Sequence, residues 1–275
     1  MSPIIVSVLL LGILGTVFGA ILAFASKKLA VETDPRVGEI LEALPGANCG
    51  ACGYPGCSGL ADAIVGGAAP VGACPVGKAR VAAEIAAIMG VEFDSNAKPQ
   101  HARVVCQGGK TERVDRFYYM GVADCAAAGM LNGGPKVCEY GCLGLGNCVR
   151  ACMFDALRIN DNGLPEVNPK RCTGCGACVK ACPRGLMKLI DEDQQVMVLC
   201  KSHSKGPEVR KACKVGCIGC GICAKNCPEQ AITVTDYLAE INPEKCTACG
   251  ICVEKCPMKT IKFAQEDGKV KVKVG

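Results

Sequence analysis

The sequence has little of the bulky apolar volume from which domains of this size usually build a core. Among its 275 residues there is no tryptophan, and all aromatic residues together make up 4%. Aromatic side chains bury large apolar areas and often dominate core energetics. Their scarcity disfavours one large hydrophobic core. It favours small folds stabilised in another way, such as by bound metal, because metal binding and folding are linked.

Groups suited to bond-making chemistry are also scarce. The chain has two histidines, His101 and His203, and neither has an acidic and nucleophilic constellation nearby in the sequence. No G-x-G-x-x-G motif follows a strand-like run, and no Walker A motif is present. We therefore expect no catalytic residues and no flavin or NAD site in this chain.

Charge is absent from the side chains before Lys27. The stretch from Pro3 to Ala25, PIIVSVLLLGILGTVFGAILAFA, is about one bilayer thickness long as a helix. Lys27 and Lys28 follow it, and the positive-inside rule then places the rest of the chain in the cytoplasm. A cleaved signal peptide would have a basic start and a shorter apolar stretch. We expect a single-pass anchor in the cell (inner) membrane, with the remainder cytoplasmic.

Cysteine, in contrast, is abundant: the chain has 24. Most of these residues lie two or three positions apart, in runs of three or four. Such runs suit convergence on one metal centre better than a disulfide framework does.

The first group of cysteines follows an expected helix from Pro35 to Leu44, for which Asp34 is the candidate N-cap. Its spacing is C-x2-C-x4-C-x16-C, and interleaved glycines let the backbone turn its amides toward cluster sulfurs. A zinc site is the alternative, since four cysteines also bind Zn²⁺. The group consists of Cys49, Cys52, Cys57 and Cys74.

The second half of the chain contains an internal repeat. Residues Asn168 to Leu189 read NPKRCTGCGACVKACPRGLMKL, and Asn242 to Phe263 read NPEKCTACGICVEKCPMKTIKF. Related cysteine runs lie upstream, in Gly141 to Leu157 and in Gly216 to Ile232. Bacterial two-cluster ferredoxins carry two runs of C-x2-C-x2-C-x3-C-P, in which the fourth cysteine ligates the other cluster.

This rule predicts three complete ligand sets for [4Fe–4S] clusters. They are Cys217, Cys220, Cys223 and Cys256; Cys227, Cys246, Cys249 and Cys252; and Cys152, Cys172, Cys175 and Cys178.

A fourth set is imperfect, because Leu145 stands where the second repeat has Cys220. Only Cys142, Cys148 and Cys182 remain of it, and we expect Cys138, just upstream, to be the replacement. The alternatives are a three-iron cluster, or ligation by Cys125 or Cys106.

Four cysteines stay unassigned: Cys106, Cys125, Cys200 and Cys213. Cys106 and Cys200 each follow an apolar, strand-like run, and Cys213 precedes Cys217 by four residues, as Cys138 precedes Cys142. We expect reduced, buried thiols, since free cysteine behaves as a small hydrophobe. A further cluster or a redox-sensitive pair are the alternatives.

The formal net charge of +5 counts every cysteine as neutral. A [4Fe–4S] core with four thiolates carries about −2, so five clusters would bring the total to about −5. Because no stripe of basic and aromatic residues is present either, we expect no nucleic-acid partner.

Together these features resemble the B subunit of the Rnf complex, an ion-pumping ferredoxin:NAD⁺ oxidoreductase. The specific parts of the resemblance are the N-terminal apolar helix, NCGACGYPGC with the later ACPVG, and CEYGCLGLGNCVRAC. A second ferredoxin-like repeat, Val196 to Phe263, departs from the shortest family members.

The expected fold class is α+β, with one N-terminal transmembrane helix, a small helical [4Fe–4S] module and two tandem ferredoxin-like 2[4Fe–4S] domains. The expected boundaries are 1–28 for the anchor, 29–90 for the N-terminal module, 91–134 for a connecting segment, and 135–192 and 193–275 for the two ferredoxin-like domains.

The resemblance implies an electron-relay subunit of a translocase with at least five [4Fe–4S] clusters. It implies exchange of electrons with soluble ferredoxin and relay to membrane and flavin-bearing Rnf subunits, coupled to Na⁺ or H⁺ transport. Basic residues in the second repeat are candidates for steering an acidic ferredoxin: Lys201, Lys205, Arg210, Lys211 and Lys214. The alternatives are a subunit of another membrane redox complex, a subunit that keeps a redox-sensing regulator reduced, or a zinc-binding interaction protein with a membrane tether.

Overall fold

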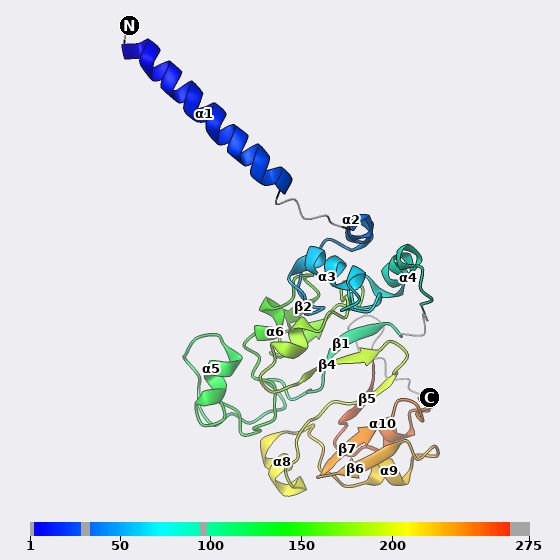
Figure 1. Cartoon of the computed structure of the whole chain (residues 1–275). Helices are drawn as coiled ribbons and strands as arrows, with labels where there is room; N and C mark the ends of the chain where they lie inside the picture. The colour runs from blue at the N-terminus through cyan, green and yellow to red at the C-terminus, as the bar shows by residue number, and fades with distance from the viewer. Residues whose placement is uncertain (1–2, 29–33, 94–97, 265–275) are drawn as a thin grey trace.

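The computed structural model describes residues 3–28, 34–93 and 98–264. Helix α1 (Pro3–Lys28) is the one helix in these ranges that is long and apolar enough to cross a membrane. Its apolar side chains from Val8 to Phe24 are exposed, and none of the apolar stretch is buried inside the protein. Figure 1 shows α1 extending away from the folded part of the chain.

The N-terminal module is a cluster of three helices, α2 (Pro35–Ala43), α3 (Gly56–Val65) and α4 (Lys78–Met89). The carboxylate of Asp34 caps α2 by accepting a hydrogen bond from the Arg36 amide at 2.9 Å, which confirms the predicted start of this helix. The helices bury one small apolar core, formed by Ile40, Leu44, Leu60, Ala61, Ile64, Ala69, Val81 and Ile85.

The remainder consists of two units with the same order of elements. The first contains β1 (Gln100–Val104), α5 (Cys125–Met130), α6 (Asn147–Arg150), β2 (Leu157–Ile159), β3 (Pro165–Val167), α7 (Ala177–Lys180) and β4 (Met187–Asp191). The second contains β5 (Val196–Val198), α8 (Gly206–Ala212), α9 (Ile222–Lys225), β6 (Ile232–Thr235), β7 (Leu238–Ile241), α10 (Ile251–Lys255) and β8 (Ile261–Phe263).

Each unit pairs its first strand with its last and closes a hairpin between them. In the first unit β1 pairs antiparallel with β4, from Gln100 opposite Asp191 to Val104 opposite Met187, and β2 pairs with β3. In the second unit β5 pairs with β8, and β6 with β7. The expected internal repeat is therefore also a repeat of topology (Figure 1).

Strand β1 lies in the segment 91–134, which we expected to be a connector. Its backbone is instead part of the first ferredoxin-like unit, because it forms a two-stranded sheet with β4. The second unit has its equivalent strand, β5, inside the expected boundaries of 193–275.

The cores of the two units are small, and cysteines are part of them. The first is built around Cys148, Cys178, Leu157, Val167 and Met187. The second is built around Cys223, Cys252, Val196, Ile232 and Ile261. Such a small apolar core is what the scarcity of aromatic residues predicts, and cysteine side chains are part of it.

Candidate iron–sulfur sites

Four cysteine runs share one local backbone geometry. In each, the third cysteine is the second residue of a short helix, and the glycine before that helix has a φ between +73° and +82°. This left-handed conformation favours glycine, and here it turns the chain so that the cysteine points inward. The four buried cysteines of the chain are these: Cys148, Cys178, Cys223 and Cys252.

The fourth cysteine of each run accepts a hydrogen bond from the amide four residues later. The donor–sulfur distances are between 3.3 and 3.4 Å in all four runs, and the donors are the amides of Ala156, Leu186, Ala231 and Thr260. The acceptors are the sulfurs of Cys152, Cys182, Cys227 and Cys256. Hydrogen bonds to ligand sulfurs fix their orientation and tune the potential of a bound cluster.

In the second repeat two small cavities are each lined by four cysteines. One, of about 20 Å³, has Cys217, Cys220, Cys223 and Cys256 in its wall. The other, of about 10 Å³, has Cys227, Cys246, Cys249 and Cys252. Both groups are the sets that the run spacing assigns, with the fourth cysteine crossing to the other run.

Neighbouring thiols are also found in two further sets, with Cys152, Cys172 and Cys175 beside Cys178, and with Cys52 and Cys57 beside Cys74. Burial raises the pKa of Cys178 to about 12, and the neighbouring Cys172, Cys175, Cys148 and Cys152 add to the rise. Burial likewise raises the pKa of Cys74, and Cys57 and Cys52 add to that rise. Cys49 lies three residues before Cys52 on the same loop, where the Asn48 side chain accepts a hydrogen bond from the Cys57 amide at 2.8 Å.

Cys138 does not line the cavity that contains the other three cysteines of the imperfect set. The cavity that contains Cys142, Cys148 and Cys182 has Cys125 as its fourth cysteine, and its volume is about 20 Å³. Burial raises the pKa of Cys148 to about 11, and both Cys182 and Cys125 contribute to the rise. Of the alternatives weighed for this set, the geometry favours Cys125.

Residues of the cysteine run itself hold Cys125 in place. Asp124 caps α5 by accepting from the Ala127 amide at 2.8 Å. The Asn147 side chain accepts from the Cys125 amide at 2.8 Å and donates to the Asp124 carboxylate at 2.7 Å. Asn147 stands next to Cys148, where the second repeat has Ile222, and this polar substitution is the sequence signal that could have pointed to Cys125.

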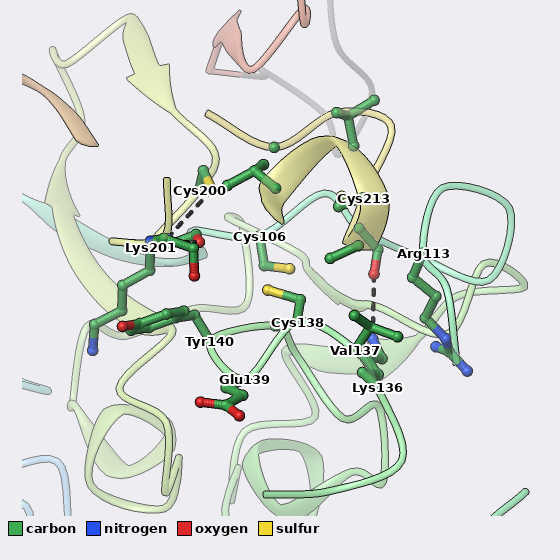
Figure 2. Close-up of a pocket in the computed structure, with 18 of the residues that line it drawn as sticks. Cys106, Arg113, Lys136, Val137, Cys138, Glu139, Tyr140, Cys200, Lys201 and Cys213 are labelled. Carbon is green, nitrogen blue, oxygen red and sulfur yellow. Dashed lines mark hydrogen bonds between the residues drawn. The ribbon is translucent and has the colours of Figure 1, made fainter. Parts of the chain in front are cut away.

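Cys138 instead lines a separate cavity together with the other three unassigned cysteines, Cys106, Cys200 and Cys213 (Figure 2). The volume of this cavity is about 260 Å³.

The elevated thiol pKa values have a common cause. Burial raises the pKa of Cys223 and of Cys252 to about 11, and neighbouring cysteines of the same sets add to the rise. Iron ligation requires thiolates, so loading these sites releases protons and stabilises the fold that gathers the sulfurs.

The cysteine side chains are not placed to bind a single metal ion directly. Within the described ranges, no group of three or more His, Cys, Asp or Glu side chains lies close enough together to hold one metal ion. The same holds for the cysteines of the second repeat, which line two small cavities.

Three protein-family models match parts of the chain that contain these cysteines. A model described as a putative Fe–S cluster matches residues 44–76. A 4Fe–4S binding domain matches residues 165–188, and a 4Fe–4S dicluster domain matches residues 216–271.

Relatives of known function cover most of the chain. The B subunit of the Na⁺-translocating ferredoxin:NAD⁺ oxidoreductase complex of Acetobacterium woodii is 48% identical over 89% of this chain and 73% of its own length. The B subunit of the ion-translocating oxidoreductase complex of Methanosarcina acetivorans is 47% identical, over 89% of this chain and 92% of its own. The B subunit of the proton-translocating ferredoxin:NAD⁺ oxidoreductase complex of Clostridium ljungdahlii is 44% identical, over 88% and 85%.

Proposed function

The chain belongs to the family of B subunits of Rnf-type ion-translocating oxidoreductase complexes, and from this we propose that it carries electrons from soluble ferredoxin to membrane and flavin-bearing subunits through at least five [4Fe–4S] clusters. As a member of this family it is an iron–sulfur electron-transfer subunit of a ferredoxin:NAD⁺ oxidoreductase. Its several 4Fe–4S domains and its apolar N-terminal helix agree with that role.

The donor chemistry fits iron–sulfur clusters. Each candidate set consists of four cysteines gathered on glycine-rich loops, and cysteine thiolates are the usual ligands of [4Fe–4S] clusters. Such a cluster supplies reversible one-electron transfer when bound. The chain's own contribution is to hold the sulfurs, bury them, and donate amide hydrogen bonds to them.

The proposal has five ligand sets, which the geometry and the run spacing support. Four are the sets that the sequence predicts, at Cys49, Cys52, Cys57 and Cys74; Cys152, Cys172, Cys175 and Cys178; Cys217, Cys220, Cys223 and Cys256; and Cys227, Cys246, Cys249 and Cys252. In the fifth, Cys125 takes the place expected for Cys138, beside Cys142, Cys148 and Cys182. The observation that carries the proposal is the pair of cavities in the second repeat, each lined by one complete predicted set.

Helix α1 would place the protein on the membrane as a single-pass anchor. The basic residues Lys27 and Lys28 end the helix, which favours a cytoplasmic position for the cluster-bearing part by the positive-inside rule. This is the side on which soluble ferredoxin is available.

Helix α8 is the candidate surface for ferredoxin. Its exposed basic side chains, Arg210 and Lys211, stand next to exposed Lys205 at its N-terminal end. Lys201 and Lys214 of the expected basic patch are engaged differently, since each ammonium donates to backbone carbonyls nearby. A positive surface raises the rate of encounter with an acidic partner, and salt screens the effect.

Rapid mixing of the full chain with reduced ferredoxin tests this function. Bleaching of the visible iron–sulfur absorption should follow mixing, and its second-order rate should fall with added salt. Replacing Lys205, Arg210 and Lys211 by glutamate should slow the reaction at low salt about tenfold or more. The matched control, glutamate at Lys78 in the N-terminal module, should leave the rate unchanged. A chain whose clusters stay oxidised in the presence of reduced ferredoxin would refute the proposal.

A further inference from the structure

One cavity contains four cysteines that none of the five ligand sets uses. It has a volume of about 260 Å³ and lies between the two ferredoxin-like units. Figure 2 shows the side chains of Cys106 and Cys138 pointing toward each other inside it, with Cys200 and Cys213 in the surrounding wall. All four are free thiols of intermediate exposure.

The four cysteines come in equivalent pairs, one pair from each unit. Cys106 lies two residues after the end of β1, and Cys200 lies two residues after the end of β5. Cys138 and Cys213 each precede the first cysteine of a run by four residues. Because β1 and β5 are equivalent strands of the repeat, each unit contributes the same two positions, and the set is complete only where the units meet.

A short backbone segment links the residues next to two of these cysteines, Cys213 and Cys138. The segment Arg113 to Asp115 forms an antiparallel bridge to Cys213 on one side and to Lys136 on the other. The Val114 amide donates to the carbonyl of Ala212, the neighbour of Cys213, at 3.0 Å. The amide of Val137, the neighbour of Cys138, donates to the Val114 carbonyl at 2.9 Å. Gly108 fits closely here, since a Cβ at this position would lie 3.1 Å from the Cys213 sulfur.

Backbone amides reach the sulfurs of this cavity as they do in the other sets. The Cys106 sulfur accepts from the Cys142 amide at 3.5 Å, and the Cys200 sulfur accepts from the Ser202 amide at 3.4 Å. Burial raises the pKa of Cys213, and a hydrogen bond from the Val215 amide opposes the rise. Burial likewise raises the pKa of Cys138, opposed by the amides of Tyr140 and Gly141.

Buried positive charge faces the same cavity. Lys136 is 1% exposed, and its ammonium donates to the Gly108 carbonyl at 3.2 Å. No salt bridge to a carboxylate is found for it within the described ranges, where the neighbouring Asp115 is paired with Arg113 at 2.7 Å. Burying an ammonium without an opposite charge costs free energy. An anionic group in the cavity would therefore offset the cost of burying the Lys136 ammonium.

We propose that Cys106, Cys138, Cys200 and Cys213 bind a sixth [4Fe–4S] cluster at the junction of the two ferredoxin-like units. The proposal rests on the proposed function for the nature of the ligand, and on the paired geometry for the site. With it, six sets of four account for all 24 cysteines of the chain.

The position of this site gives it a role as a link between the two units. The Cys142 amide that reaches Cys106 belongs to a ligand of the first unit. On the other side, the amide of Cys217, a ligand of the second unit, bonds to the Cys200 sulfur and opposes the burial that raises the pKa of this thiol to about 12. The junction site therefore contacts one ligand set in each unit.

Iron and acid-labile sulfide per chain, measured on the purified full chain in detergent, test the proposal. The wild type should contain six clusters by native mass spectrometry. The double variants Cys106→Ala/Cys200→Ala and Cys138→Ala/Cys213→Ala should each lose one cluster, and all four substitutions together should lose the same single cluster. Ser204→Ala, which changes a cavity residue without a thiol, serves as the matched control and should keep six.

Two results would overturn the proposal. One is a wild type with five clusters whose double variants also keep five, and the other is zinc in place of iron at this set alone. In both cases the ferredoxin reaction of the other clusters would persist, which separates this failure from failure of the proposed function. Retention of the remaining five clusters in each variant shows that the chain still folds.

Discussion

Lys136 should raise the reduction potential of the centres on either side of it. Burial lowers the pKa of Lys136, and Arg113 adds to this, whereas Cys106 and Cys142 favour the charged form. These two cysteines belong to different ligand sets, the junction set and the set with Cys125. A buried positive charge stabilises the more negative, reduced form of a cluster, so removing it should make reduction harder.

The expected size of the effect follows from the burial of this side chain. Unit charges roughly 6 to 10 Å apart at an effective dielectric of about 20 interact by roughly 1.7 to 2.8 kcal/mol. For a one-electron couple this corresponds to roughly 70 to 120 mV. Because Lys136 is 1% exposed, solvent screening reduces this value little. Lys136→Met keeps the length and apolar stem of the side chain and removes the charge.

Redox titration monitored by electron paramagnetic resonance measures this shift. In Lys136→Met one or two centres should move to lower potential by the stated amount, while the others stay in place. Lys211→Met, an exposed position on α8, is the control and should shift no centre by more than about 20 mV, because water and salt screen exposed charges. Unchanged potentials in a Lys136→Met protein that retains all its iron would refute the reasoning.

Three further outcomes are expected. Cys125→Ala should remove one cluster, and adding Leu145→Cys should restore it, because residue 145 stands where the second repeat has a ligand; a Cys125→Ala chain with undiminished iron would contradict this assignment. Gly219→Ala should destabilise its loop by about 1–3 kcal/mol and lower the iron content, because the new Cβ would lie 2.8 Å from the backbone of the turn between β6 and β7. Gly221→Ala has a similar φ but open space around its Cβ, so it should lower the melting temperature less. Removing residues 1–28 should yield a soluble brown protein, and persistent sedimentation with membranes would show a second attachment.

Much of the molecule could be predicted from the sequence because the information is local. The cysteine runs, their glycines and the cap at Asp34 lie within a few residues of the groups they position, and short-range spacing determines their geometry. The crossing of the fourth cysteine to the other run joins segments about twenty residues apart and stays a prediction from the repeated motif, with which the two cavity linings of the second repeat agree.

The part that sequence left open depends on contacts between distant segments. Strand β1 has its partner in β4, far along the chain, so the segment 91–134 looked like a connector. In the sequence both Cys125 and Cys138 are candidates for the fourth ligand of the imperfect set, and Cys138 lies nearer to that cysteine run. The hydrogen bond between Asn147 and Cys125, and the bridges formed by Arg113 and Asp115, place the two cysteines in different cavities. Cysteine spacing alone does not predict these contacts.

The most direct test of the whole account is the metal and sulfide content of the full chain, purified without oxygen. Six [4Fe–4S] sites on 24 cysteines predict about 24 iron and about 24 acid-labile sulfide per chain, by the four-iron composition of each cluster. Iron without matching sulfide, or zinc in place of iron, would contradict the claim that these cysteines form an iron–sulfur relay.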